Sequence, residues 1–211
     1  MRRSKRMLGV FVVTAVLSIC PPAESFILIN EFLADPPTGI NGDANHDGIG
    51  SSTQDEFVEL FNSSTETVNL SGWQISDALR VRHVFTAGSL LLPWEYIAVF
   101  GGGAPNLPGV KWQKASTGAL SLNNDTDVIT LFDGSSTLVD RVLYGSIANH
   151  DQSIVRIGTQ LFLHSQLSES SGKLFSPGTS VDGQRTQEAP VPELPTLLYA
   201  LLSGLAFLRK K

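Results

Sequence analysis

Three oxygen-bearing side chains occupy alternate positions in the segment NGDANHDGIG: Asp43, Asn45 and Asp47, followed directly by Gly48. This spacing lets the three side chains converge on one point, while the glycine allows the chain to bend sharply. In a calcium-binding loop that starts at Asp43, the backbone carbonyl of Ile49 would supply the next ligand. The spacing therefore predicts a site for one Ca²⁺ ion.

The acid that should complete this calcium site is displaced along the chain. The twelfth position of the loop holds Gln54, and Asp55 and Glu56 follow one and two positions late. We therefore expect Asp55 or Glu56 to close a calcium loop inserted between strands, where the ion has a structural role, and Asp35 could join it. The alternative is a solvated turn, in which Asp, Asn and Gly occur because turns favour them.

The four histidines show no catalytic or zinc-binding pattern. His46, His83, His150 and His164 lack the i,i+4 spacing of a zinc helix, and no serine lies in a nucleophile-elbow sequence. We expect each of them to be a surface or half-buried strand residue. The sequence therefore favours a protein that is not an enzyme.

The acidic loop and the histidines lie among short segments of apolar or of alternating apolar and polar residues. Gly, Pro, Asn and Asp separate these segments. Such a pattern predicts an antiparallel sandwich or barrel without long helices. In residues 55–61, apolar and polar residues alternate imperfectly, so we expect one face of this strand in the core and one in water. The expected strands are residues 26–33, 55–61, 67–70, 73–76, 81–85, 95–100, 127–132, 138–144, 153–157 and 161–164.

Composition points to one folded domain with an acidic body. The 211 residues are 42% hydrophobic and 17% charged, with 19 Gly and 11 Pro. Seven of the 15 Lys and Arg residues lie at the chain ends, as does one of the 20 acidic residues, so residues 26–208 carry a net charge of −11. This charge argues against a nucleic-acid partner and favours cations.

The amino end has the order of parts of a secretory signal. Basic residues 1–6 precede an apolar run at residues 8–19, and small residues follow before Phe26. We expect residues 1–25 to be a signal peptide that is removed after Ser25, with lipid modification at Cys20 as the alternative. Because Cys20 is the only cysteine, the exported chain would have no disulfide.

The carboxyl end has a polar linker, an apolar run and a basic end, in that order. Residues 183–190 form a polar linker, and residues 191–211 begin with Val191-Pro192-Glu193, continue with an apolar run and end with Arg209-Lys210-Lys211. The apolar run is shorter than the ~20 residues of a stable membrane span. This order resembles the PEP-CTERM sorting signal of Gram-negative bacteria, which implies processing by an exosortase and only transient contact with the membrane. An ordinary membrane anchor or a buried terminal helix is the alternative.

A set of motifs in the body of the chain resembles the lamin tail domain family. These motifs are Ile29-Asn30-Glu31, residues 55–60, Asn69-Leu70-Ser71-Gly72-Trp73 with Ile75-Ser76-Asp77, residues 127–131 and residues 174–179. The resemblance covers residues 26–182 and implies an all-β, immunoglobulin-like antiparallel β-sandwich.

These patterns together predict a non-catalytic module exported to the cell surface or extracellular matrix of a Gram-negative bacterium. Adhesion or scaffolding, through contact with an extracellular polysaccharide or a surface protein, is the expected role, with one calcium ion as stabiliser. The alternative from a different class is a secreted, phosphoesterase-like hydrolase or an accessory module to one, because bacterial lamin tail domains resemble modules attached to such enzymes.

Overall fold

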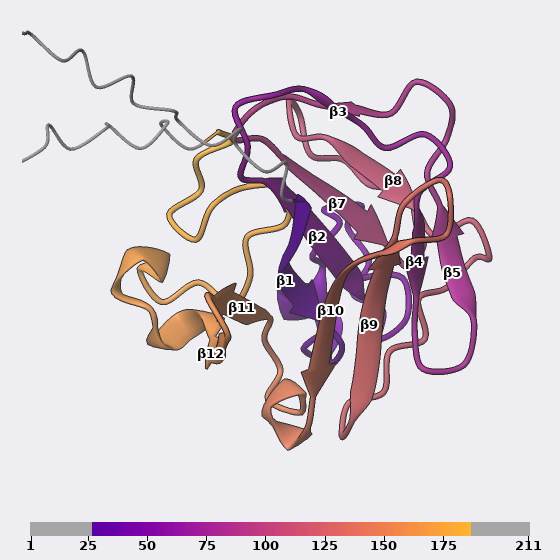
Figure 1. Cartoon of the computed structure of the whole chain (residues 1–211). Helices are drawn as coiled ribbons and strands as arrows, with labels where there is room; N and C mark the ends of the chain where they lie inside the picture. The colour runs from indigo at the N-terminus through magenta and orange to yellow at the C-terminus, as the bar shows by residue number, and fades with distance from the viewer. Residues whose placement is uncertain (1–26, 187–211) are drawn as a thin grey trace, which may run out of the picture.

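The computed structural model describes residues 27–186, and in this part of the chain all regular structure is β-strand or short 3-10 helix (Figure 1). The larger strands pack as two layers. The strands are β1 Ile27–Leu33, β2 Phe57–Asn62, β3 Val68–Asn69, β4 Gln74–Ser76, β5 Val81–Val84, β6 Leu90–Leu91, β7 Tyr96–Phe100, β8 Trp112–Lys114, β9 Asp127–Phe132, β10 Leu138–Tyr144, β11 Ile154–Ile157 and β12 Gln160–Leu163. The 3-10 helices are η1 Gly39–Gly42, η2 Ser146–Ala148, η3 His164–Gln166 and η4 Ser168–Ser170.

Two antiparallel sheets form the layers. The larger has the order β12-β11-β1-β2-β7-β8, and the smaller has the order β10-β9-β4-β5. Strands β3 and β6 form a separate pair, and β7 with β8 is the one parallel pairing among the described strands. The predicted immunoglobulin-like β-sandwich is therefore confirmed.

The core fills the space between the two sheets. Alternate residues of β1, β2 and β7 point inward, because successive side chains of a strand face opposite sides of its sheet. A bulge in the pairing of β1 with β2, between Ile29 and Glu31, shifts this alternation along β1. The fully buried core side chains include Ile29, Phe32, Leu60, Ile75, Leu91, Leu120, Ile129, Leu131 and Ile154.

The outer face of the larger sheet is covered as well, and here the sequence expectation for residues 55–61 is wrong. Every residue of β2 is buried, including Glu59 and Asn62. Leu33, Phe57 and Phe100 form a second apolar cluster on this face, against which Phe175 packs. A segment far away in the sequence, which includes Phe175, thus covers the face of β2 that the alternation within this strand predicts to be exposed to solvent.

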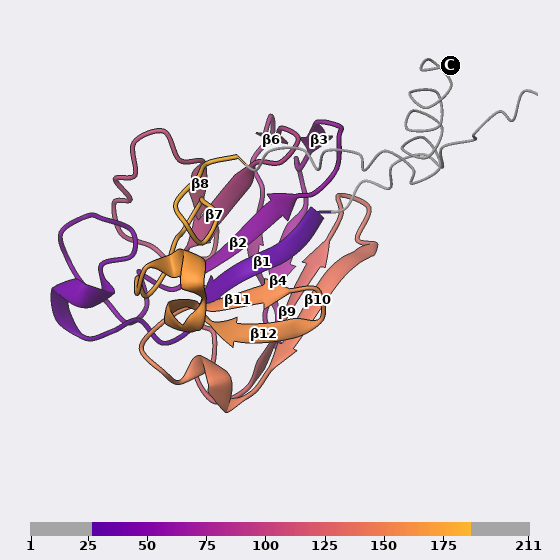
Figure 2. The ribbon, with the colours of Figure 1, turned by 90° about the vertical axis from the view of Figure 1, so that its left-hand side faces the viewer.

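The two ends of the described chain lie at the same end of the sandwich (Figure 2). Ile27, the first residue of β1, pairs with Asn62, and Thr186 forms a bridge with Glu95, just before β7. The segment between β1 and β2, with η1 and the acidic loop, lies at the opposite end. Both buried apolar clusters are built from residues 27–186, so residues 26–188 retain the core of the sandwich.

The predicted signal peptide, residues 1–25, and the predicted sorting signal, residues 191–211, lie outside the described residues, as does half of the 183–190 linker, residues 187–190. Residues 27–186 contain no helix that is long and apolar enough to cross a membrane.

Candidate cation-binding loop and buried carboxylates

The acidic loop is organised by hydrogen bonds from its own backbone. The carboxylate of Asp43 accepts one from the N–H of Asp47, at 3.0 Å, and one from the N–H of Gly48, at 2.9 Å. Gly48 has a φ of 89°, a left-handed conformation that glycine adopts without strain. The glycine predicted to allow the bend therefore does so.

The next two side chains tie the loop to its surroundings. The amide oxygen of Asn45 accepts a hydrogen bond from the N–H of Asp47, at 2.9 Å, and the Asp47 carboxylate accepts from the N–H groups of Ile49 and Ala104, each at 2.9 Å. At Gly103, an added Cβ would lie 2.4 Å from Asn45 Nδ2 and 2.5 Å from Asp47 Oδ2. This close approach explains the glycine at Gly103.

Asp55 closes the loop from its far end. Its two carboxylate oxygens accept hydrogen bonds from the N–H of Asn45, at 2.9 Å, and the N–H of Ser51, at 2.7 Å. Burial raises the pKa of Asp55, these backbone hydrogen bonds oppose the shift, and the nearby charges of Asp43 and Asp47 add to it. Asp43, Asn45, Asp47 and Asp55 therefore belong to one hydrogen-bonded loop.

Glu56 does not join this group. Its side chain is buried, and its carboxylate accepts a hydrogen bond from the N–H of Ser121, at 2.7 Å. Burial raises the pKa of Glu56 to about 8, although this hydrogen bond and the charge of Arg82 oppose the shift. Asp35 is also engaged elsewhere, through the Asn124 side chain and the N–H of Asp151.

The loop offers the oxygen ligands that calcium prefers, namely three carboxylates and one amide oxygen. Each carboxylate has about four lone-pair positions, so the oxygens that accept N–H groups retain capacity for a cation. In residues 27–186, however, no three His, Cys, Asp or Glu side chains are already placed to hold a metal ion. A calcium ion would therefore draw the side chains of Asp43, Asn45, Asp47 and Asp55 closer together around it.

A second set of acids, which the sequence did not single out as a site, lies under the carboxyl-terminal segment. Glu31 and Glu59 are fully buried neighbours on β1 and β2. Glu31 accepts hydrogen bonds from the hydroxyl of Ser153, at 2.6 Å, and from the N–H and hydroxyl of Ser176, at 2.9 and 2.6 Å. These contacts fasten residues 153 and 176 to the outer face of the sheet.

Glu59 holds the same segment two residues further along. One oxygen accepts from the N–H groups of Gly178 and Thr179, at 2.6 and 3.1 Å, and the other accepts from the side-chain amide of Asn30, at 2.7 Å. Burial raises the pKa of Glu59 well above its ordinary value, and the charge of Glu31 adds to this shift. The alternation in residues 55–61 predicts that Glu59 faces solvent. The sequence signal that could have marked this acid pair is Ser176-Pro177-Gly178-Thr179, the segment that covers it.

His164 completes a buried chain of hydrogen bonds with Ser176 and Glu31. Its Nδ1 lies 2.8 Å from the Lys173 carbonyl, so Nδ1 must carry a proton, and its Nε2 lies 3.0 Å from Ser176 Oγ. Ser176 has one hydroxyl proton to share between His164 and Glu31.

The expected exposure is wrong for two of the four histidines, and of the four only His83 lies in a strand. His83 and His164 are fully buried, whereas His46 and His150 are exposed. Both ring nitrogens of His83 lack a partner of normal hydrogen-bond geometry within the described residues, although Gln113 and the Lys114 backbone lie near. Burial lowers the pKa of His83 to about 4. His83 of β5 is thus a buried residue of the smaller sheet, and its ring contacts that of Phe85.

The contact between Ser176 and His164 is the one that most resembles a nucleophile beside a base. The hydroxyl of Ser176 also lies 2.6 Å from a Glu31 oxygen, and the histidine and the glutamate are both inaccessible to solvent. A substrate could not reach this serine without displacing residues that cover the sheet. The arrangement therefore suits fastening of the carboxyl-terminal segment.

The comparison with protein families gives one match. A family model described as Lamin Tail Domain matches residues 21–146 of the chain. The match ends before β11, so the strands and the carboxyl-terminal segment that cover Glu31 and Glu59 lie beyond it. No curated protein matches the chain.

Proposed function

On the premise that this chain belongs to the lamin tail domain family, whose model matches more than half of it, we propose that it is a non-catalytic exported display module. Its role would be adhesion or scaffolding at the cell surface or in the extracellular matrix of a Gram-negative bacterium. The partner would be an extracellular polysaccharide or another surface protein. The fold by itself does not choose among these roles, because β-sandwiches serve many functions.

The observation that carries this proposal is the separation of the chain ends from the acidic loop. Thr186 bridges to Glu95 beside the start of β7, while the loop follows the opposite end of β1. A strand of seven residues such as β1 spans ~23 Å. A module attached through its carboxyl-terminal residues would therefore hold the loop end away from the point of attachment.

The route to the surface is part of the same proposal. Residues 1–25 would direct export, and residues 191–211 would act as a PEP-CTERM-like signal processed by an exosortase, with only transient contact with the membrane. The supporting features are the Val191-Pro192-Glu193 signature, the short apolar run and the basic end. Replacement of these three residues by alanine should leave the protein in the membrane fraction, whereas correct release of the variant would contradict this route.

One structural calcium ion in the acidic loop would stabilise the module. Asp43, Asn45, Asp47 and Asp55, with the Ile49 carbonyl, would hold it, and its charge would offset the repulsion among three neighbouring carboxylates. At tenfold excess over Kd, binding to the folded state alone adds about 1.4 kcal/mol to the free energy of unfolding. Sites of this kind outside the cell bind calcium at ~0.1–1 mM.

The experiment is thermal unfolding of residues 26–188 with calcium and with a chelator. Calcium should raise the midpoint for the native sequence and for the control Asp125→Ala, an exposed acid outside the loop, but not for Asp43→Ala or Asp47→Ala. An unmoved midpoint in the native sequence would rule out the ion. Hydrolysis of bis(p-nitrophenyl) phosphate that is abolished by His46→Ala would instead identify the chain as a phosphoesterase.

A further inference from the structure

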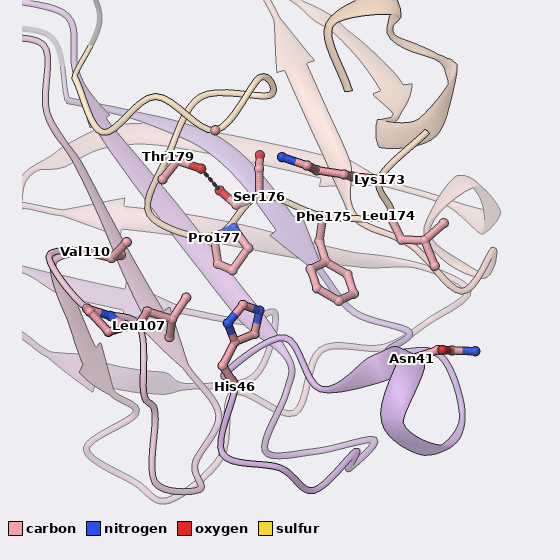
Figure 3. Close-up of a pocket in the computed structure, with 12 residues that line it drawn as sticks. Asn41, His46, Leu107, Val110, Lys173, Leu174, Phe175, Ser176, Pro177 and Thr179 are labelled. Carbon is pink, nitrogen blue, oxygen red and sulfur yellow. Dashed lines mark hydrogen bonds between the residues drawn. The ribbon is translucent and has the colours of Figure 1, made fainter. Parts of the chain in front are cut away.

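A pocket lies beside the acidic loop, where this loop faces residues 173–179 (Figure 3). Its volume is about 570 Å³, and it lies between the loop, the segment before β8 and the carboxyl-terminal segment. Its apolar walls are formed by Leu107, Pro108, Val110, Leu174, Phe175 and Pro177. Pockets that bind small molecules typically measure ~300–1,000 Å³ and have mostly apolar walls with a few polar groups.

The walls of this pocket are held in place by buried contacts. Glu59 binds the N–H groups of Gly178 and Thr179 behind the wall. Gly178 packs so closely against Val110 that an added Cβ would lie 2.0 Å from a Val110 methyl carbon. Phe175 packs on the buried apolar cluster of the outer sheet face. Because both walls are fixed on the sheet, the pocket does not need a ligand to form it.

The polar groups at the edge of the pocket are mainly cationic or neutral. Lys173 and His46 line it, and the His46 ring points toward Phe175 and Pro177 (Figure 3). The guanidinium of Arg185 lies over Gly109 and donates to the carbonyl of Pro108, at 3.0 Å. The two cations at this edge, Lys173 and Arg185, contrast with the acidic body of the chain.

Carboxylates near this edge are engaged by other groups. Glu31 and Glu59 lie behind the wall, where hydroxyl and backbone N–H groups satisfy them. The carboxylate of Asp182 accepts hydrogen bonds from the Ser180 hydroxyl and the Gln184 N–H. The Ser180 hydrogen bond lowers the pKa of Asp182, and the charge of Lys173 adds to this shift. Among the described residues, Lys173 forms no ion pair within 4.0 Å, so its charge remains for a ligand.

We propose that this pocket binds a small amphipathic anion, with an apolar acyl body against Val110 and Phe175 and a carboxylate head near Lys173. The apolar walls favour the body because its burial removes hydrocarbon from water. The lysine selects the sign of the head group. This site is separate from the proposed calcium ligands and goes beyond the display role.

The experiment uses three probes with one hydrocarbon chain and different heads: octanoate, 1-octanol and octylammonium. Each is titrated below its aggregation limit into residues 26–188, in a chelating buffer of low ionic strength, and amide NMR shifts report the site and Kd. Octanoate should bind most tightly and octylammonium least, with the largest shifts at residues 107–110 and 173–179. The chelator makes the result independent of the calcium proposal.

Two variants test the head group and a third tests the walls. Lys173→Gln should weaken octanoate binding about threefold, toward the affinity for 1-octanol, as expected for one partly exposed charge pair. Lys173→Arg should keep the native affinity, and Val110→Asp should abolish binding. Equal binding of octanoate and octylammonium, shifts at another site, or unchanged affinity in Lys173→Gln would overturn the proposal. If Val110→Asp does not fold, the two lysine variants still decide.

Discussion

Glu31 and Glu59 face the same side of the larger sheet as paired residues of β1 and β2, and both side chains are completely buried. Like charges on paired strand residues repel, and burial adds the cost of removing both from water. The carboxyl-terminal segment offsets this cost with the hydroxyl and N–H of Ser176 and the N–H groups of Gly178 and Thr179. The acid pair thus explains how an irregular segment stays on the sheet.

Ser176→Ala should lower the free energy of unfolding by about 1–3 kcal/mol, because Glu31 and His164 would each lose a buried partner. Chemical denaturation of residues 26–188 measures the difference. Ser135→Ala is the matched control, since the Ser135 side chain is exposed, and it should change stability by less than about 0.5 kcal/mol. Equal stability of the native sequence and Ser176→Ala would show that this network contributes little.

Glu59→Gln should flatten the dependence of stability on pH above the ordinary glutamate pKa. Because burial and Glu31 raise the pKa of Glu59 in the folded state, the folded chain binds more protons than the unfolded chain. The contribution of Glu59 to the free energy of unfolding is therefore complete below pH ~4.3. It is lost as pH rises through the raised pKa, by about 1.4 kcal/mol per pH unit. Denaturation at several pH values measures this slope.

The substitution at Glu59 keeps an oxygen for Gly178 and Thr179 if the Asn30 amide turns to accept the new amide group. Glu169→Gln, at an exposed position, should retain the slope of the native sequence. A slope that Glu59→Gln leaves unchanged would assign the pH dependence to other groups, of which Glu56 is the first to test because its pKa is also raised.

His83→Phe should reduce the loss of stability in acid. Burial lowers the pKa of His83 to about 4, so protonation is harder in the folded state than in the unfolded chain. The contribution of neutral His83 to the free energy of unfolding is therefore complete above pH ~6.5. It is lost as pH falls through 4, by about 3 kcal/mol in total. The difference between variant and native stability should be constant between pH 7 and 8 and change below that range. A constant difference down to pH 4 would contradict the lowered pKa.

The strands that the sequence defined best are those whose borders are set by local turns. The predicted strands at residues 127–132 and 138–144 agree with Asp127–Phe132 and Leu138–Tyr144 residue for residue. Asp133 supports the turn between them, because its carboxylate accepts hydrogen bonds from the N–H groups of Ser135 and Thr137. Such a hairpin is specified within a few neighbouring residues, so one sequence is enough to recognise it.

The covering of the larger sheet was not visible from the sequence, because it depends on residues far apart along the chain. Glu59 contacts residues 178 and 179, about 120 positions later, and Glu31 contacts Ser176. The alternation within β2 predicts which residues share a face of the sheet, but it does not predict which other segment covers that face. The prediction of Glu56 as a calcium ligand depends on its nearness in sequence to Asp55. The direction of its side chain, which contacts the Ser121 N–H, depends instead on a residue far along the chain.

The calcium response should therefore depend on Asp43 and not on Glu56. Asp43→Asn keeps an oxygen for the N–H of Gly48 but removes the charge, so the gain in midpoint between chelator and calcium should disappear. Glu56→Gln should retain this gain even if it changes the midpoint itself, because Glu56 contacts Ser121 and not the loop. Thermal unfolding of both variants measures the gain. If instead Glu56→Gln abolishes it and Asp43→Asn retains it, calcium must bind a different ligand set, one in which Glu56 turns outward.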